Sequence, residues 1–205
     1  MSEKQKIALV TGAAGTMGKA AAVGLIEDGY RVVLADINQE VLEKVAQELG
    51  HDSYPIAFDI SKFDACKKVA SEVGSVDVLV NNAGILSNNK TAGTTPEEWH
   101  KVMSVNLDGA FYLIQLCLPG MKEKKWGRII NTSSFAAKSG GITAGTAYSV
   151  SKAAIIGLTF SIAAETLKTG VTVNGIAPAY VRTPMVEKQL NDEERAAVLA
   201  KIPVG

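Results

Sequence analysis

A tyrosine and a lysine, Tyr148 and Lys152, are four residues apart in a segment of helical character, so they share one face of a helix. A phenol with a pKa near ~10 exchanges protons poorly at neutral pH unless a nearby positive charge stabilises the phenolate. The Lys152 ammonium is such a charge. Ser134 ends the preceding apolar run and can donate a hydrogen bond to a carbonyl oxygen on which negative charge develops. These residue types predict acid–base chemistry at an alcohol or carbonyl group; the alternative is a chance pair on a helix face.

A glycine-rich turn, Thr11–Gly18, follows the first apolar run of the chain and opens a helical segment. Gly12, Gly15 and Gly18 allow the backbone to turn sharply and to approach a pyrophosphate at the positive N-terminus of the helix. The turn therefore predicts a dinucleotide site, and a tight turn that binds nothing is the alternative.

Asp36 closes the second apolar run, 18 residues after Gly18. A carboxylate there can accept hydrogen bonds from both hydroxyls of the NAD ribose, and its charge repels the 2′-phosphate of NADP. Gly15, Thr16 and Ile37 occupy positions at which an arginine or lysine would attract that phosphate. The pattern predicts NAD(H) as the cofactor; the alternative is that Asp36 is a solvated strand end.

Polar residues also follow the next two apolar runs. Asp59 comes after the third run and Asn81–Gly84 after the fourth. An open α/β sheet binds ligands at the carboxyl ends of its strands, which predicts that these residues line the same crevice. Asn and Asp are also ordinary turn residues, so a purely local role is the alternative.

Six short β-branched runs alternate with segments of helical periodicity along the whole chain. Most of the runs are nearly continuous in apolar residues, which is typical of strands buried on both faces of a parallel sheet. The predicted strands are Ile7–Thr11, Arg31–Asp36, Ser53–Phe58, Val76–Val80, Arg128–Thr132 and Val171–Ala177. The fold class that follows is α/β: a Rossmann-type, doubly wound parallel sheet in three layers.

Helical segments between the strands carry apolar stripes. The three stripes are Met17, Ala20, Ala21, Gly24 and Leu25; Val41, Leu42, Val45 and Leu49; and Cys66, Val69, Ala70 and Val73. Thr95, followed by Pro96 and by Glu98, predicts the start of another helix. Two later helices, Ala110–Leu118 and Ala153–Ala164, are apolar on nearly all sides, so we expect them to meet a second subunit of a homo-oligomer, a dimer or tetramer.

The composition of the 205-residue chain excludes several classes of protein. With 21 basic and 21 acidic residues, it lacks the positive surface that nucleic-acid binding requires. No stretch reaches the ~18 uninterrupted apolar residues of a membrane helix, and the N-terminal apolar run is too short for a signal peptide. Two cysteines and two histidines without ligand spacing predict neither a disulfide framework nor a metal site. We expect one cytoplasmic domain over residues 1–205.

These motifs, in this order, resemble the short-chain dehydrogenase/reductase family, in particular its 3-oxoacyl-reductase-like subgroup, from about Lys6 to the last residue. The motifs that carry the resemblance are Thr11–Gly18, Asp36, Asp59, Asn81–Gly84, Asn106, Ser133–Ser134, Tyr148–Lys152 and Pro178–Met185. The resemblance implies that Tyr148 is the general acid/base and that Lys152 lowers its pKa and binds the nicotinamide ribose. It also implies that Ser134 orients the substrate oxygen and that Asn106 holds a proton relay through Lys152 and water.

The same resemblance implies a set of cofactor contacts, in which Asp59 lies by the adenine and Val181 and Thr183 contact the nicotinamide amide. The full set is Gly12, Gly15, Thr16, Met17, Gly18, Asp36, Ile37, Asp59, Ile60, Asn82, Ala83, Gly84, Tyr148, Lys152, Pro178, Val181 and Thr183.

Four departures from the family pattern accompany the resemblance. Thr16 stands where Gly or Ala is usual, and Ala179 stands where Gly usually follows the proline. Ser134 lies one residue farther from the tyrosine than is common, so Ser133 remains a rival. The sequence stops at Gly205, where relatives continue, so we expect the last helix and strand of the fold to be absent and a sheet edge to be exposed.

The expected activity is hydride transfer between NAD(H) and a secondary alcohol or ketone. The loops Ile85–Thr94, Phe135–Gly145 and Arg182–Lys201, the last as a loop or lid, should contact the substrate, but their sequences specify no chemical group. A reductase of 3-oxoacyl thioesters is the alternative enzyme, although such reductases generally use NADPH, which Asp36 disfavours. The non-enzymatic alternative is a sensor or scaffold that binds NAD without turnover. Four basic residues lie in or beside these loops: Lys90, Lys138, Arg182 and Lys188. They could select an anionic substrate, and the alternative is that they are simply solvated.

Overall fold

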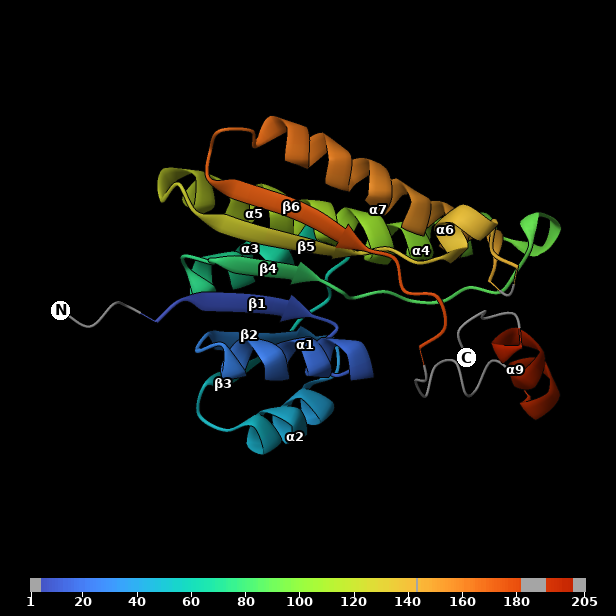
Figure 1. Cartoon of the computed structure of the whole chain (residues 1–205), viewed down its shortest axis with the longest axis horizontal. Coiled ribbons are helices and arrows are strands. Elements are labelled where there is room, and N and C mark those ends of the chain that lie inside the picture. The colour runs from blue at the N-terminus through green and yellow to red at the C-terminus, as the bar shows by residue number, and fades with distance from the viewer. Residues whose placement is uncertain (1–4, 143, 182–190, 201–205) are drawn as a thin grey trace.

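The computed structural model of the chain describes residues 5–142, 144–181 and 191–200 (Figure 1). Its strands are β1 (Ile7–Thr11), β2 (Arg31–Asp36), β3 (Ser53–Ala57), β4 (Val78–Asn81), β5 (Gly127–Thr132) and β6 (Val171–Ile176). Its helices are α1 (Thr16–Glu27), α2 (Gln39–Leu49), α3 (Phe63–Val73), α4 (Pro96–Met103), α5 (Gly109–Glu123), α6 (Ala136–Ser139), α7 (Thr146–Glu165) and α9 (Asp192–Leu199). Two short helical turns add to these: η1 (Thr91–Gly93) and the π-helical η2 (Ser104–Asp108).

The strands form one parallel sheet in the order β3-β2-β1-β4-β5-β6. The direction of winding reverses at β1, which pairs with both β2 and β4. Sheets of this kind bind ligands at the carboxyl ends of the strands beside that reversal. The predicted α/β fold is confirmed. β1 and β2 have the predicted ends, whereas β4 begins at Val78 instead of Val76, because its pairing with β1 starts with Ala8 opposite Val78.

Helices cover both faces of the sheet, which gives the predicted three layers (Figure 1). Leu42 and Val45 of α2 pack with Ala22 of α1 against one face. Val69 of α3 and Leu113 of α5 belong to the core of the other face. α7 lies beside α5 on this second face and packs against β5 and β6. The N-terminal half of α7 thereby reaches the carboxyl ends of the strands.

The apolar stripe predicted for α1 is partly wrong. Its buried positions are Gly18 and Ala22, while Ala20 and Gly24 are exposed. Because all of these residues are small, the sequence pattern gives little contrast between the faces of this helix. The close approach of Gly18 to the turn after β1 decides which face is buried. The stripes of α2 and α3 face the core as predicted, with Leu42, Val45, Cys66 and Val69 buried and the other four residues half-buried.

α4, η2 and α5 follow one another without a break, and the predicted helix start is confirmed: Thr95 Oγ1 accepts a hydrogen bond from the Glu98 N–H at 3.2 Å. By length and composition alone, this stretch and α7 could each cross a membrane. Both nevertheless contribute side chains to the core beside the sheet. Phe111 on α5 and Phe160 on α7 are 41% and 72% exposed, which is an apolar surface of the kind that another subunit can cover.

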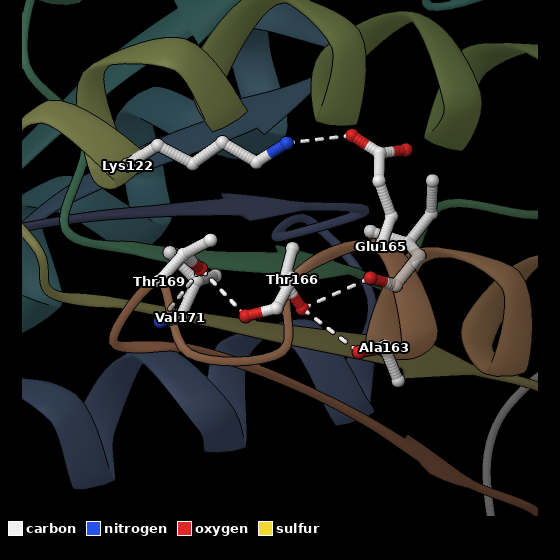
Figure 2. Close-up of polar contacts among 7 residues, drawn as sticks. Lys122, Ala163, Glu165, Thr166, Thr169 and Val171 are labelled. Atoms are coloured by element: carbon white, nitrogen blue, oxygen red, sulfur yellow. Dashed lines mark hydrogen bonds and ion pairs between the residues drawn. The ribbon is translucent and has the colours of Figure 1, made fainter.

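Threonine side chains fix the turn between α7 and β6 (Figure 2). Thr166 Oγ1 donates to the Ile162 carbonyl at 2.9 Å, and Thr169 Oγ1 donates to the Thr166 carbonyl at 2.6 Å. Lys122 at the end of α5 forms an ion pair with Glu165 at the end of α7, at 2.6 Å (Figure 2). These contacts define the carboxyl end of α7 and join it to its neighbouring helix.

Candidate active site

Tyr148 and Lys152 lie in the first two turns of α7, next to the end of β5. Lys152 is only 4% exposed, and its Nζ donates a hydrogen bond to the Thr132 carbonyl at 2.8 Å. The same Nζ lies 5.9 Å from the centre of the Tyr148 ring. The helix therefore brings an ammonium group and a phenol to one site, as the four-residue spacing predicts.

Burial changes the proton affinity of both groups. It lowers the pKa of the Lys152 ammonium to about 8, and it raises the pKa of the Tyr148 phenol. A hydrogen bond with Ser134 opposes the effect of burial on the Tyr148 pKa, because it favours the phenolate. In the chain without bound ligand Tyr148 keeps its proton, and the phenolate needs further positive charge at the site.

The lowered pKa of Lys152 predicts a pH dependence of stability. Between pH 8 and the ordinary lysine pKa of 10.5, the unfolded chain binds a proton that the folded chain has released, so this residue contributes more to stability as the pH rises. We expect the free energy of unfolding of the wild type, minus that of Lys152→Met, to increase from pH 8 to pH 10.5 in urea titrations. The control is Lys44→Met on α2, which removes the same side chain from an exposed ion pair with Glu40. A flat difference for Lys152→Met contradicts the buried ammonium.

Ser133 and Ser134 have different partners. The buried Ser133 Oγ donates to the Lys152 carbonyl at 2.7 Å, so it joins the end of β5 to α7. The Ser134 Oγ accepts from the Ala136 N–H at 3.1 Å and is hydrogen-bonded to the Tyr148 phenol. The structure thus favours Ser134 over Ser133 as the hydroxyl that meets a substrate oxygen.

Asn106 is buried in the π-helical turn η2, and π-helical turns are frequent at functional sites. Its Oδ1 accepts from the Ile85 N–H at 2.8 Å, and its Nδ2 donates to the Ile85 carbonyl and to Ser151 Oγ, both at 3.0 Å. Ser151 Oγ in turn donates to the Tyr148 carbonyl at 2.7 Å. Asn106 therefore connects the loop after β4 to α7. Ser151 is not among the predicted site residues, since nothing in its local pattern indicates a partner 45 residues away.

Gly84 is the point where this loop meets the Lys152 side chain. A Cβ atom at Gly84 would lie 3.2 Å from the Lys152 Nζ and 3.3 Å from the Asn106 Oδ1. The glycine thus keeps backbone, ammonium and amide close together, and this juxtaposition fits the relay that the family resemblance implies for Asn106 and Lys152.

Asn82 and Ala83 hold the loop after β4 against the end of β1. Their N–H groups both donate to Thr11 Oγ1 at 3.0 Å. The Asn82 Nδ2 donates to the carbonyls of Thr11 and Gly12 at 3.1 and 3.3 Å. The side chain of Asn82 therefore shapes the glycine-rich turn, and its contact with a cofactor stays a prediction.

The glycine-rich turn presents the N-terminus of α1 to the crevice. Gly12 has a φ of +66° and its carbonyl accepts from the Gly15 N–H at 3.1 Å. A Cβ atom at Gly18 would lie 2.2 Å from the Gly12 carbonyl oxygen, so helix and turn are in backbone contact. At the helix end formed by Gly15, Thr16 and Met17 there is no side-chain cap and no acidic residue. These features fit a pyrophosphate, which would take the free N–H groups.

Asp36 lies at the end of β2, beside this turn. Its Oδ2 accepts from the Ala14 N–H at 3.2 Å and its Oδ1 from the Ile37 N–H at 2.8 Å. The neighbouring Ile37 side chain is exposed. The carboxylate thus stands where the ribose of a dinucleotide is held in folds of this kind.

Asp59 and Ile60 follow β3 and have local partners. The N–H and hydroxyl of Ser61 donate to the Asp59 Oδ1 at 2.9 and 2.7 Å, and the bond from the hydroxyl lowers the pKa of this carboxyl. Ile60 packs on the start of α5, where a Cβ atom at Gly109 would lie 2.6 Å from its side chain. The contacts of Asp59 and Ile60 with a cofactor stay predictions.

The segment after β6 returns to the loop that holds Ser134. The Pro178 carbonyl accepts from the Phe135 N–H at 2.8 Å, and Val181, the last residue before 182–190, is half-buried. Farther along the chain, α9 lies within the predicted substrate loop 182–201. The predicted residues outside the described part of the chain are Arg182, Thr183 and Lys188.

Lys90 differs from the expectation for the substrate cleft. Its Nζ donates to the carbonyls of Gly141 and Ala144 at 2.5 and 2.6 Å, so the ammonium has internal partners. It is therefore neither a free anion-binding group nor simply solvated. A lysine that crosses between two loops cannot be distinguished by sequence from a solvated one such as the exposed Lys138.

The cysteines and histidines lie apart from this site. Burial raises the pKa of Cys66 to about 11 and of Cys117 to about 12, so both thiols stay protonated and pack in the core. His51 and His100 are exposed. Within residues 5–142, 144–181 and 191–200, no group of three or more His, Cys, Asp or Glu residues could hold a metal ion.

A doubly wound parallel sheet, an uncapped glycine-rich helix N-terminus at its switch point, and a Ser–Tyr–Lys site along the same edge define an oxidoreductase that binds a nicotinamide nucleotide. Comparison with known proteins gives the family. The sequence profile of the short chain dehydrogenases matches residues 6–194, and this chain belongs to that family.

The chain is similar to several curated proteins and solved structures. It is 40% identical to the 3-oxoacyl-(acyl-carrier-protein) reductase FabG of Vibrio cholerae, over 100% of this chain and 85% of that protein. Nodulation protein G of Azospirillum brasilense is 41% identical over 98% of this chain and 84% of its own length. A 3-oxoacyl-(acyl-carrier protein) reductase from Brucella melitensis with bound NAD superimposes with a TM-score of 0.83 at 35% identity, covering 92% of this chain and 76% of that one. A putative NAD(P)-dependent gluconate 5-dehydrogenase from Beutenbergia cavernae with bound NADP superimposes with a TM-score of 0.89 at 33% identity. This match covers 98% of this chain and 83% of that one.

Proposed function

We propose that this short-chain dehydrogenase transfers a hydride between NAD(H) and a secondary alcohol or ketone, with Tyr148 as the general acid/base. The observation that supports this most directly is the position of the Tyr148 ring, 5.9 Å from the buried ammonium of Lys152 at the end of β5. A protein that only senses or stores NAD has no use for this combination of groups.

Each residue of the site has a defined task in alcohol oxidation. The nicotinamide, when bound, supplies the hydride acceptor. Tyr148 takes the proton of the substrate hydroxyl, and Ser134 donates a hydrogen bond to the same oxygen as it becomes a carbonyl. Lys152 stabilises the phenolate by its charge, and with Asn106 it connects Tyr148 to solvent for proton release. In ketone reduction the same residues act in reverse.

We assign the nucleotide to NAD(H) because of Asp36. Its carboxylate would accept hydrogen bonds from the ribose hydroxyls and would repel a 2′-phosphate. The solved relatives support a nicotinamide nucleotide in general, since one holds NAD and another NADP. The choice between the two rests on this single side chain and on the absence of a basic residue at Gly15, Thr16 and Ile37.

Asp36→Ala should reduce the preference for NADH over NADPH by about tenfold, because it removes both the ribose contact and the repulsion of the phosphate. The measurement is the dissociation constant of each nucleotide by fluorescence titration. Asp28→Ala at the opposite end of α1 is the control, because it removes the same charge away from the crevice. An unchanged ratio in Asp36→Ala would exclude Asp36 from cofactor selection.

A 3-oxoacyl thioester is a second candidate substrate. It is favoured by the similarity to the 3-oxoacyl-(acyl-carrier-protein) reductases of Vibrio cholerae and Brucella melitensis, and its 3-oxo group is a ketone that Tyr148 and Ser134 can polarise in the same way. Turnover of acetoacetyl-CoA, compared with small ketones, each with NADH and with NADPH, distinguishes the two. If the enzyme prefers the thioester with NADPH, a 3-oxoacyl-thioester reductase replaces the NAD(H)-dependent alcohol dehydrogenase as the assignment. If the protein binds NADH but turns over none of these compounds, a sensor or scaffold is favoured.

We further propose that the enzyme is a cytoplasmic homo-oligomer, a dimer or tetramer. The exposed Phe111 and Phe160 on the outer helices of the second face support a subunit contact there. Sedimentation of the chain, followed by that of Phe160→Glu, tests the contact, because a charge placed at a buried apolar contact should dissociate the oligomer.

A further inference from the structure

Main-chain carbonyls of residues 87–89, and no side chain, cap the N-terminus of α7. The Gly145 N–H donates to the Ser87 carbonyl at 2.6 Å, and the Thr146 N–H donates to the Asn89 carbonyl at 3.0 Å. A Cβ atom at Gly145 would lie 2.6 Å from the Asn89 oxygen and 2.7 Å from the Ser87 oxygen, so the two backbones are in direct contact. Tyr148 lies in the first turn beyond this contact. A shift of residues 87–89 would therefore move the helix end that carries the phenol.

Glu98, in the first turn of α4, holds residues 87–89 from the other side. Ser87 Oγ donates to one oxygen of its carboxylate, and Asn89 Nδ2 donates to the other oxygen at 2.7 Å. The Glu98 N–H is itself bonded to Thr95 Oγ1, so the carboxylate projects from a capped helix end. The hydrogen bonds from Asn89 and Ser87 lower the pKa of Glu98. As a carboxylate, it can accept from both donors at once.

The helix that carries Glu98 also leads to Asn106. α4 runs into η2 without a break, so Glu98 and Asn106 belong to one rigid helical stretch. Asn106 bonds to Ser151 on α7, one turn beyond Tyr148, while Glu98 acts through residues 87–89 on the end of α7 before Tyr148. Two contacts from one helix thus bracket the tyrosine.

We propose that Glu98 is a positioning residue for Tyr148. By fixing residues 87–89, it sets the place of the phenol relative to Ser134 and to a bound substrate, although it touches neither substrate nor cofactor. This inference rests on the proposed acid/base function of Tyr148.

Glu98→Ala should lower kcat about 10- to 100-fold, since small displacements of a catalytic group have effects of this size. The dissociation constant of NADH should change by less than about twofold, because the glycine-rich turn and Asp36 lie on the other half of the sheet. The matched control is Glu97→Ala, whose carboxylate bonds to its own N–H and to Thr95 but does not reach residues 87–89. Equal loss of kcat in the two variants overturns the proposal.

A paired exchange tests the contact itself. Glu98→Gln leaves a single acceptor oxygen, so the side chain can no longer accept from Ser87 and Asn89 at once, and kcat should fall. Adding Asn89→Asp supplies a carboxylate that the new amide can donate to, which restores the hydrogen bond with its direction reversed and the charge unchanged. We expect the double variant to recover at least half of the wild-type kcat. A double variant no better than Glu98→Gln alone counts against the proposal.

Hydrogen exchange separates this proposal from the proposed function. In Glu98→Ala, the amide hydrogens of Gly145 and Thr146 should exchange about tenfold faster, while Glu97→Ala leaves them unchanged. Unchanged exchange in Glu98→Ala overturns the role of Glu98, whatever the activity. Wild-type protein that binds NADH but reduces no carbonyl compound counts against the proposed function instead.

Discussion

Tyr148→Phe should lower turnover by about 10²–10⁴-fold, the size of effect expected when a general acid/base is removed. The substitution deletes one oxygen and keeps the ring, so the packing of α7 and the position of Lys152 should persist. The dissociation constant of NADH should stay nearly unchanged, because the free N–H groups of α1 and the Asp36 carboxylate are intact. Initial rates with an alcohol and a ketone, together with a fluorescence titration of NADH, provide the measurement.

The control for this variant is Tyr112→Phe. Tyr112 lies on α5, where its ring packs against Phe63 at 5.3 Å, away from the site. Its hydroxyl should contribute nothing to turnover. If Tyr148→Phe turned over like the wild type, the acid/base role would have to pass to another group, and the assignment of Ser134 and Lys152 as its supporting residues would fall with it.

Gly18→Ala should lower the free energy of unfolding by about 3 kcal/mol or more and abolish NADH binding. A methyl group at Gly18 would lie 2.2 Å from the Gly12 carbonyl oxygen and 2.9 Å from the Ala13 Cα, both of them backbone atoms. Helix and turn must therefore separate, which exceeds the ~1–3 kcal/mol of ordinary overpacking. The same separation moves the N–H groups of α1 away from a pyrophosphate. Urea titration and fluorescence titration measure the two effects.

Gly24→Ala provides the comparison on the same helix. Gly24 has no atom within 4 Å of its would-be Cβ, and α1 has ordinary helical conformation there. Alanine should therefore stabilise the chain by up to ~1 kcal/mol, since it lowers the entropy of the unfolded state and favours helix. Equal stability of the Gly18 and Gly24 variants would contradict the close approach of α1 to the turn.

The sequence was sufficient for the sheet and for the proximity of Tyr148 and Lys152, because both rest on local patterns. β1 and β2 end where their apolar runs end, and Thr95 caps α4 as its neighbours predict. The i, i+4 spacing of Tyr148 and Lys152 places them on one side of α7 whatever surrounds the helix.

Contacts between distant segments could not be predicted in this way. The partners of Lys90 are backbone carbonyls about 50 residues away. Because every residue has a backbone carbonyl, residue type gives no indication of such a partner. The pairing of Asn106 with Ser151 depends on how η2 and α7 pack, and the buried face of α1 depends on the approach of Gly18 to Gly12. For these features, tertiary structure selects among residues that are locally equivalent.

The place of β1 between β2 and β4 has a thermodynamic consequence. The first half of the sheet is built from the early part of the chain and the second half from the later part, and β1–β4 is the pairing that joins them. The proposed nucleotide site lies at this junction, where the loop after β4 meets the turn after β1. A dinucleotide that contacts both halves at once stabilises the sheet against global unfolding. At a ligand concentration of 100 times Kd, the free energy of unfolding should rise by about 2.7 kcal/mol. We therefore expect bound nucleotide to slow proteolysis of the chain.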